Sequence, residues 1–90
     1  MLAKSSGTSP PKASKVKIQS ISGIPIQMFE VEVISNGENV ALGKSATQSS
    51  NFKNKKIFGA SKAVDGLMDR FTHTHKNDKS AWWTLDLPWR

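Results

Sequence analysis

The segment AWWTLDL, residues 81–87, decides the fold class, because its apolar side chains recur at every second position. Trp83, Leu85 and Leu87 fall on one face of an extended chain, and Trp82 falls on the other. Successive side chains of a β-strand point to opposite faces of the sheet. The pattern therefore predicts a strand with one indole in the core and its neighbour over the rim of the sheet.

Two upstream segments share this two-residue period. KVKIQ, residues 15–19, alternates between apolar and polar side chains, and so does MFEVEVI, residues 28–34. In the second segment the expected inward positions are Phe29, Val31 and Val33, with the glutamates pointing outward. β-Branched residues favour strands, and no long segment has helical periodicity. The sequence therefore predicts a mostly β fold.

Turn residues separate these strands. Asn36 and Gly37 form a dipeptide that is typical of tight hairpin turns. KAVDGL, residues 62–67, is expected to form a brief helical turn that ends at Gly66, since glycine commonly terminates helices. Residues 39–50 are rich in Ser and Thr and poor in bulky apolar side chains, which predicts an irregular segment or a short edge strand.

Composition limits the function classes. The chain has 90 residues, no cysteine and a formal net charge of +6, so thiolate catalysis and cysteine-based zinc sites are excluded. Residues 1–14 are rich in Ser, Pro, Lys and Gly and predict a flexible basic tail or linker. No apolar run is long enough for a transmembrane segment, and residues 1–14 lack a signal-peptide pattern, so the compartment stays open.

A second basic cluster, Lys53, Lys55 and Lys56, has two interpretations. The first is a set of solvated lysines, and the second is attraction to phosphate or sulfated sugar. Phe52 and Phe58 flank the cluster, which keeps a basic nucleic-acid-binding fragment as an alternative. No recognisable nucleic-acid module surrounds these lysines, so nucleic acid is not the expected partner.

The order of several motifs resembles a known family. NVALGKSATQSS (39–50), ASKAVDG (60–66), and THT (72–74) followed by AWWTLDL (81–87) resemble the first half of the discoidin, or coagulation-factor type C, domain and its fucolectin relatives. KVKIQSISGIPIQMFEVEV (15–33) looks like the closing strands of the same family. The resemblance implies a galactose-binding-domain-like jelly-roll β-sandwich that is partial and incomplete in this chain.

The family order of these segments is reversed here, which implies two arrangements. In the first, residues 15–35 close one β-sandwich repeat and residues 39–90 form the N-terminal half of the next, so that the chain is a fragment without central strands. In the second, residues 15–35 dock on residues 39–90 as the closing strands of one permuted sandwich. Either arrangement leaves strand edges unpaired, which favours self-association.

The resemblance also implies a structural calcium site. Asp65 and Glu30 match carboxylate ligands, and Lys62 and Phe29 match residues that offer backbone carbonyls. Leu67 departs from the family pattern because it has no side-chain oxygen. Such an oxygen set suits calcium, which prefers six to eight oxygen ligands. The alternative role for the Asp65 turn is purely structural, since Asp commonly bonds its own backbone in turns.

Two residues are candidates for direct ligand binding. His73 matches the histidine of the family that resembles a sugar-hydroxyl contact, and a neutral imidazole can donate through one nitrogen and accept through the other. Arg70 lies on the same loop, with a surface ion pair to Asp69 as its alternative role. His73 and His75 share a face of an extended segment, but no third ligand for zinc is evident.

The sequence therefore predicts a non-catalytic, lectin-like module and not an enzyme. Expected partners are fucose- or galactose-type glycans or cell-surface ligands, in an extracellular setting that the resemblance implies. The alternative is an accessory binding domain of a larger glycoside hydrolase or adhesion protein. No phosphate-binding glycine loop occurs, and no pair of acids can be placed across a scissile bond from sequence.

Overall fold

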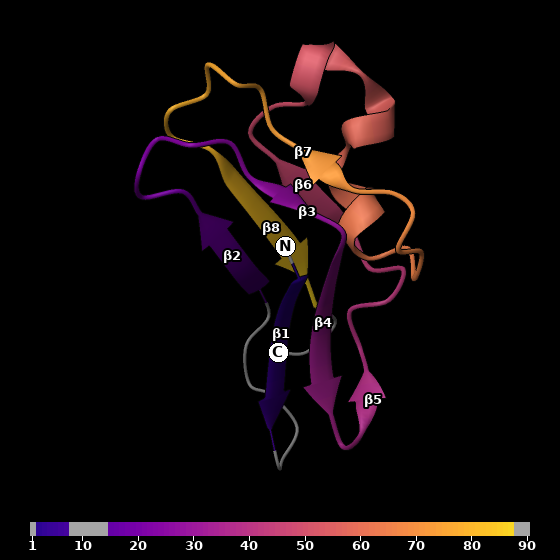
Figure 1. Ribbon diagram of the computed structural model, residues 1–90. Coiled ribbons are helices and arrows are strands. Elements are labelled where there is room, and N and C mark those ends of the chain that lie inside the picture. Colours follow the sequence, from indigo (N-terminus) through magenta and orange to yellow (C-terminus); the bar gives the residue numbers. More distant parts are fainter. Residues whose placement is uncertain (1, 8–14, 88–90) are drawn as a thin grey trace.

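The computed structural model describes residues 2–7 and 15–87, and it describes side chains over residues 15–87 (Figure 1). The described residues are mostly strand, which confirms the predicted class. The strands are β1 (Leu2–Gly7), β2 (Lys15–Gln19), β3 (Gln27–Met28), β4 (Glu30–Ser35), β5 (Glu38–Asn39), β6 (Ala46–Gln48), β7 (Thr72–His73) and β8 (Trp82–Asp86). Three short 3-10 turns are η1 (Phe52–Asn54), η2 (Lys56–Phe58) and η3 (Ala60–Ala63).

Strand β8 is the centre of an antiparallel sheet with the order β2-β8-β6. Trp83 and Leu85 are fully buried, as their alternation predicts. Val16 of β2 pairs with Leu85, and Ile18 pairs with Trp83. The Trp83 indole N–H donates to the Ala60 carbonyl at 3.0 Å, which ties the sheet to η3. A buried indole is thereby both packed and hydrogen-bonded.

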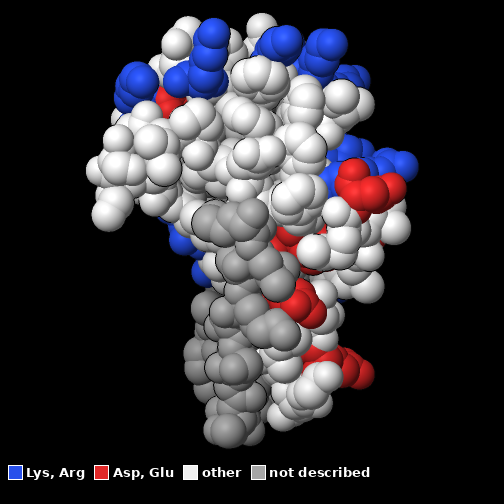
Figure 2. Space-filling view, in the orientation of Figure 1, with Lys and Arg blue, Asp and Glu red and all other residues white. Residues whose placement is uncertain are grey.

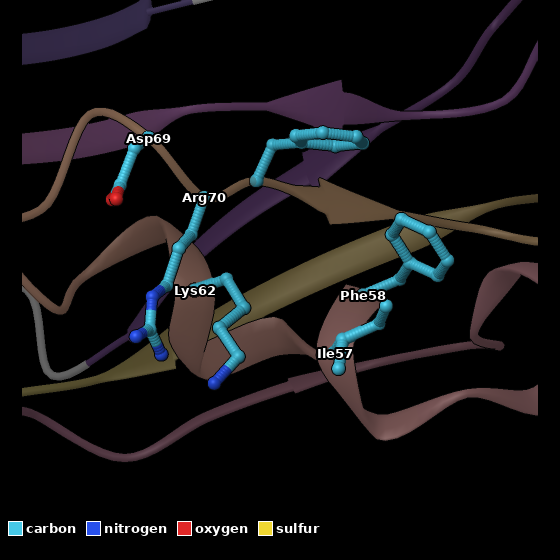
Figure 3. Close-up of a pocket in the computed structure, with 6 residues that line it drawn as sticks. Ile57, Phe58, Lys62, Asp69 and Arg70 are labelled. Atoms are coloured by element: carbon cyan, nitrogen blue, oxygen red, sulfur yellow. The ribbon is translucent and has the colours of Figure 1, made fainter.

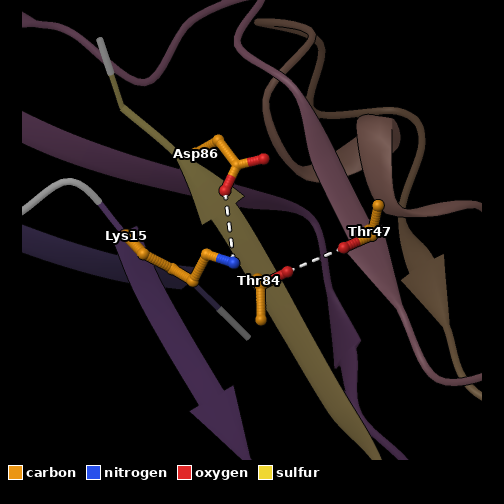
Figure 4. Close-up of polar contacts among 4 residues, drawn as sticks. All are labelled: Lys15, Thr47, Thr84 and Asp86. Atoms are coloured by element: carbon orange, nitrogen blue, oxygen red, sulfur yellow. Dashed lines mark hydrogen bonds and ion pairs between the residues drawn. The ribbon is translucent and has the colours of Figure 1, made fainter.

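The outer face of this sheet carries polar pairs (Figure 4). The Thr47 and Thr84 hydroxyls lie 2.7 Å apart across β6 and β8. Lys15 Nζ lies 3.6 Å from a carboxylate oxygen of Asp86, and both side chains are about 60% exposed. An ion pair so exposed contributes little to stability.

A second sheet has the order β1-β4-β5. Asn36 and Gly37 join β4 to β5 with φ of 52° and 81°, which confirms the predicted hairpin turn. Strand β1 runs parallel to β4, so residues 2–7 form backbone pairs where the sequence predicts a tail. The remainder of the predicted tail, residues 8–14, lies outside the described residues.

The smallest sheet pairs β3 with β7, and threonine hydroxyls extend it. Thr74 Oγ1 accepts the Ile26 N–H at 2.8 Å, and Thr72 Oγ1 accepts the Met28 N–H at 3.2 Å. Both threonines are fully buried. Their hydroxyls thus satisfy backbone donors that would otherwise be buried without a partner.

The alternation of burial changes phase at Phe29, where β3 ends and β4 begins. Met28 is fully buried, Phe29 is 36% exposed, and Glu30 is only 6% exposed; Val31 and Val33 are buried beyond it. The prediction that Phe29 points inward and Glu30 outward is therefore wrong. The chain bends at Phe29, between β3 and β4, and the bend changes which side chains point inward by one residue. The Glu30 carboxylate therefore lies inside the molecule.

The two segments that the sequence separates pack together in this chain. Strand β2 pairs with β8, and β3 pairs with β7, so residues 15–35 dock on residues 39–87. This is the pairing expected for the permuted arrangement. The sheets are small, with two or three strands each among the described residues, and the finer jelly-roll class stays a prediction.

Candidate functional site

Glu30 is the most unusual polar residue of the described core. One carboxylate oxygen, Oε2, accepts the Gly66 N–H at 3.0 Å. The other, Oε1, is buried and has no hydrogen-bond partner within residues 15–87. Ser20 Oγ and Gln48 Oε1 share that condition, but Glu30 is the one carboxylate among the three. A buried acceptor without a partner is costly, so this oxygen requires an explanation.

The turn at Asp65 holds Gly66 against Glu30. Asp65 Oδ1 accepts the Leu67 N–H at 3.0 Å, which confirms the structural role predicted for this aspartate. Gly66 has a φ of +78°, and a Cβ at this position would lie 3.1 Å from a methyl group of Leu42. The positive φ therefore favours glycine, whereas the exposed Leu42 side chain could move aside for a Cβ.

The surroundings of Glu30 disfavour the negatively charged form of its carboxyl group. Burial raises the pKa of Glu30 above its ordinary value of 4.5, and the negative charges of Asp65 and Glu32 raise it further. The hydrogen bond from Gly66 opposes these effects only in part. A bound cation would favour the charged form of Glu30 instead.

The structure thus places Glu30 against the turn that holds Asp65, and these are the two carboxylates that the resemblance names as ligands. Phe29 directly precedes Glu30, and Lys62 lies in η3, which packs against β4. Within residues 15–87 no group of three His, Cys, Asp or Glu side chains could hold a metal ion. A cation here would need backbone carbonyls, such as those of Phe29 and Lys62, beside the two carboxylates.

One ring nitrogen of His73, Nε2, has no hydrogen-bond partner within residues 15–87. Its Nδ1 lies 2.7 Å from the Thr74 carbonyl oxygen. Since a carbonyl only accepts, Nδ1 carries the proton of this bond, and the neutral ring keeps Nε2 as an acceptor. His75 differs, because its Nδ1 accepts the Asn77 N–H at 3.2 Å. Of these two histidines, His73 is therefore the one whose Nε2 can accept a hydrogen bond from a ligand hydroxyl.

Three phenylalanines, Phe52, Phe58 and Phe71, pack around His73, and Phe29 packs against Phe71. We call these four rings the aromatic band. Neighbouring rings in the band lie 5.4 to 5.5 Å apart, and the Phe52 ring lies 4.3 Å from that of His73. None of the four rings is fully buried. The band joins residues that are far apart in sequence, so no local pattern could have revealed it.

A hollow of about 370 Å³ lies beside the band (Figure 3). Its lining consists of Ile57, Phe58, Lys62, Asp69, Arg70 and Phe71. In the view of Figure 3 the charged ends of Lys62 and Arg70 lie on the same side of the lining, and the Asp69 carboxylate points away from them. No ion pair joins Asp69 to Arg70 within residues 15–87, so the pair expected from sequence does not form.

Basic side chains gather at one end of the molecule (Figure 2). This end carries the loops that follow β6 and β7, whose exposed lysines are Lys53, Lys55, Lys56, Lys76 and Lys79. The Lys53 ammonium lies 5.4 Å from the centre of the Phe52 ring. The field at this end attracts anions.

Asp78 forms a separate polar cluster that the sequence did not reveal. Its Oδ2 accepts the hydroxyls of Ser49 and Ser50. The serine oxygens in turn accept the Trp82 and His75 backbone N–H groups. Hydrogen bonds from Ser49 and then Ser50 hold the pKa of Asp78 below its ordinary value of 3.8. This cluster fastens two loops to β8.

Comparison with known proteins identifies no relative: no protein family matches the chain, and neither curated proteins nor solved structures match it. The resemblance to discoidin and fucolectin domains therefore stays a prediction. Within its described parts, the chain has no helix that combines the length and apolar character needed to cross a membrane.

Proposed function

We propose that this chain is a non-catalytic glycan-binding module, and that the aromatic band with His73 is its ligand-facing surface. The observation that carries the proposal is His73: its Nε2 is free to accept, and its ring packs against the partly exposed Phe52. Sugar rings offer hydroxyl donors and an apolar face of C–H groups. A histidine acceptor beside aromatic rings suits both.

The proposal includes a calcium ion that supports this surface from the Glu30–Asp65 turn. The buried oxygen of Glu30 without a partner is the observation that favours it. Carboxylate and carbonyl oxygens are the ligands that calcium prefers. Phe29 links the two features, since it precedes Glu30 and its ring lies 5.4 Å from Phe71 in the band. The ion would neutralise Glu30 and fix the start of β4.

Single-stranded nucleic acid is the second candidate, favoured by lysines beside aromatic rings. Two observations weigh against it. Neighbouring rings in the band are turned by 43° to 79°, so they do not form parallel platforms for successive bases. The Lys53 ammonium also lies over the Phe52 ring. The arrangement suits a compact sugar better than a strand of bases.

A glycan array probed with the whole chain tests the proposal, in calcium and in chelator. We expect binding to a limited set of glycans, and His73→Ala to weaken it about fivefold to tenfold, the effect of one lost hydrogen bond. His75→Ala is the matched control and should bind as the unmodified chain does. A blank array, with binding to a single-stranded oligonucleotide that falls steeply with salt, would replace the glycan hypothesis by the second candidate.

A further inference from the structure

The hollow beside the aromatic band combines two kinds of surface. Lys62 and Arg70 supply cations, and Ile57, Phe58 and Phe71 supply an apolar wall. We propose that this hollow binds an acidic sugar residue, one whose ring carries a carboxylate or a sulfate group. The inference rests on the proposed glycan-binding function and adds to it the chemical class of the ligand.

The first support is that the described part of the protein does not pair the Lys62 and Arg70 side chains with acids. Among residues 15–87 neither Lys62 nor Arg70 forms an ion pair. In the view of Figure 3 both charged ends lie on the same side of the lining, while the one acid of the lining, Asp69, is exposed and points away from them. The guanidinium offers a planar fork of donors that matches carboxylate geometry, and the ammonium adds a further charge-assisted bond.

The second support is the apolar wall, which a small inorganic anion would leave unused. The Phe58 and Phe71 rings lie 5.5 Å apart at an angle of 43°, and both are partly exposed. The faces of aromatic rings carry negative charge density, so they attract the weakly positive C–H groups of a sugar ring. At about 370 Å³ the hollow lies within the size range of small-molecule sites.

The third support is the overall positive charge of the molecule. The net charge is +6, and exposed lysines crowd the loops after β6 and β7 (Figure 2). Such a field concentrates anions near the surface and raises their rate of association. A neutral sugar would gain nothing from it and would leave two cations unpaired.

The experiment compares acidic sugars with their neutral parent by calorimetry on the whole chain. The probes are galacturonic acid for the carboxylate, galactose 6-sulfate for the sulfate, methyl galactoside as the neutral parent, and inorganic sulfate. We expect at least one acidic probe to bind about tenfold more tightly than methyl galactoside and than inorganic sulfate, because one charge-assisted bond supplies roughly that factor. The two acidic arms show which anionic group is preferred.

Variants then assign the binding to this hollow. Arg70→Gln and Lys62→Gln should each weaken the preferred acidic probe about tenfold. Lys17→Gln, at an exposed lysine of β2 that is neither in the hollow nor in the basic loops, should change it less than twofold. A thermal melt of each variant verifies folding. An Arg70→Gln variant that folds and binds the acidic probe normally would overturn the inference.

Other outcomes separate this inference from the proposed function. If the array shows binding and methyl galactoside binds as well as the acidic probes, the inference fails and the glycan-binding function stands. If inorganic sulfate binds more tightly than both acidic sugars, the ligand class is wrong. If the array is blank and no probe binds, both fail.

Discussion

Glu30 and Asp78 are two partly or wholly buried carboxylates that the protein treats in opposite ways. Asp78 accepts two serine hydroxyls, which lower its pKa. Glu30 accepts one backbone N–H, keeps a second oxygen buried without a partner, and has a raised pKa because burial dominates. The protein therefore supplies hydrogen-bond donors to Asp78, whereas one oxygen of Glu30 has no donor within residues 15–87.

The comparison separates a structural acid from a candidate ligand-binding acid. A carboxylate whose acceptors are filled by the protein contributes to stability as it stands. A carboxylate with a buried free oxygen lowers stability until something binds it, and sites of this kind are often functional. Three predictions test this difference, in order of decreasing expected effect.

The largest effect should come from Asp78→Ala. The substitution removes the acceptor of two serine hydroxyls and loosens two loops from β8, so we expect a loss of about 3 kcal/mol of unfolding free energy in urea. Asp69→Ala, an exposed aspartate without these bonds, should change stability by less than about 0.5 kcal/mol. Equal effects of the two variants would show that the serine cluster is not structural.

Calcium should have the next largest effect. About 10 mM calcium should raise the unfolding free energy by about 2 kcal/mol, given an affinity near that of extracellular calcium modules. Glu30→Gln should abolish this gain, because an amide is a poorer calcium ligand, whereas Glu38→Gln at an exposed position of β5 should retain it. A thermal melt in calcium and in chelator measures the shift. An equal gain in Glu30→Gln would place the ion elsewhere.

The smallest effect should be the dependence of stability on pH without calcium. Glu30 has a pKa above 4.5 when folded, so its folded form holds the proton more tightly than the unfolded chain, and stability should rise as the pH falls from neutral towards 4.5. Asp78 has a pKa below 3.8 when folded, so its contribution should be lost as the pH falls further.

Two variants test which acid causes each change of stability with pH, measured by urea unfolding at each pH. Glu30→Gln should flatten the rise between neutral pH and 4.5, and Asp78→Asn should flatten the fall below 3.8. Glu30→Gln should also be no less stable than the unmodified chain at neutral pH in chelator, since it removes a buried charge and its amide oxygen can still accept from Gly66. Unchanged slopes would show that neither acid controls them.

The elements with strong local signals could be predicted from the sequence. Strand β8 follows from the alternation around Trp83, and the hairpin follows from Asn36 and Gly37. The burial of Glu30 could not be predicted, because the bend at Phe29 turns Phe29 outward and Glu30 inward, against the alternating pattern. Tertiary contacts of β3 with β7 override the local period there.

The candidate site was predictable only in part, for a related reason. The resemblance names Glu30 and Asp65 as ligands without deciding whether they share one site, and the structure places Glu30 against the turn that holds Asp65. The aromatic band depends on contacts between residues as distant as Phe29 and Phe71, and Asp78 meets Ser50 across 28 positions. Such contacts carry no signal at short range in a single sequence.

Strand β2 lies at the edge of its sheet among the described strands, and its exposed positions include Lys15 and Lys17. Lysines on an edge strand oppose the addition of a strand from a second copy, because like charges would meet. A long polyanion would cancel this repulsion while it bound the basic loops. Sulfated polymers should therefore nucleate fibres or clusters of this protein at low salt, and simple sodium chloride at equal ionic strength should not.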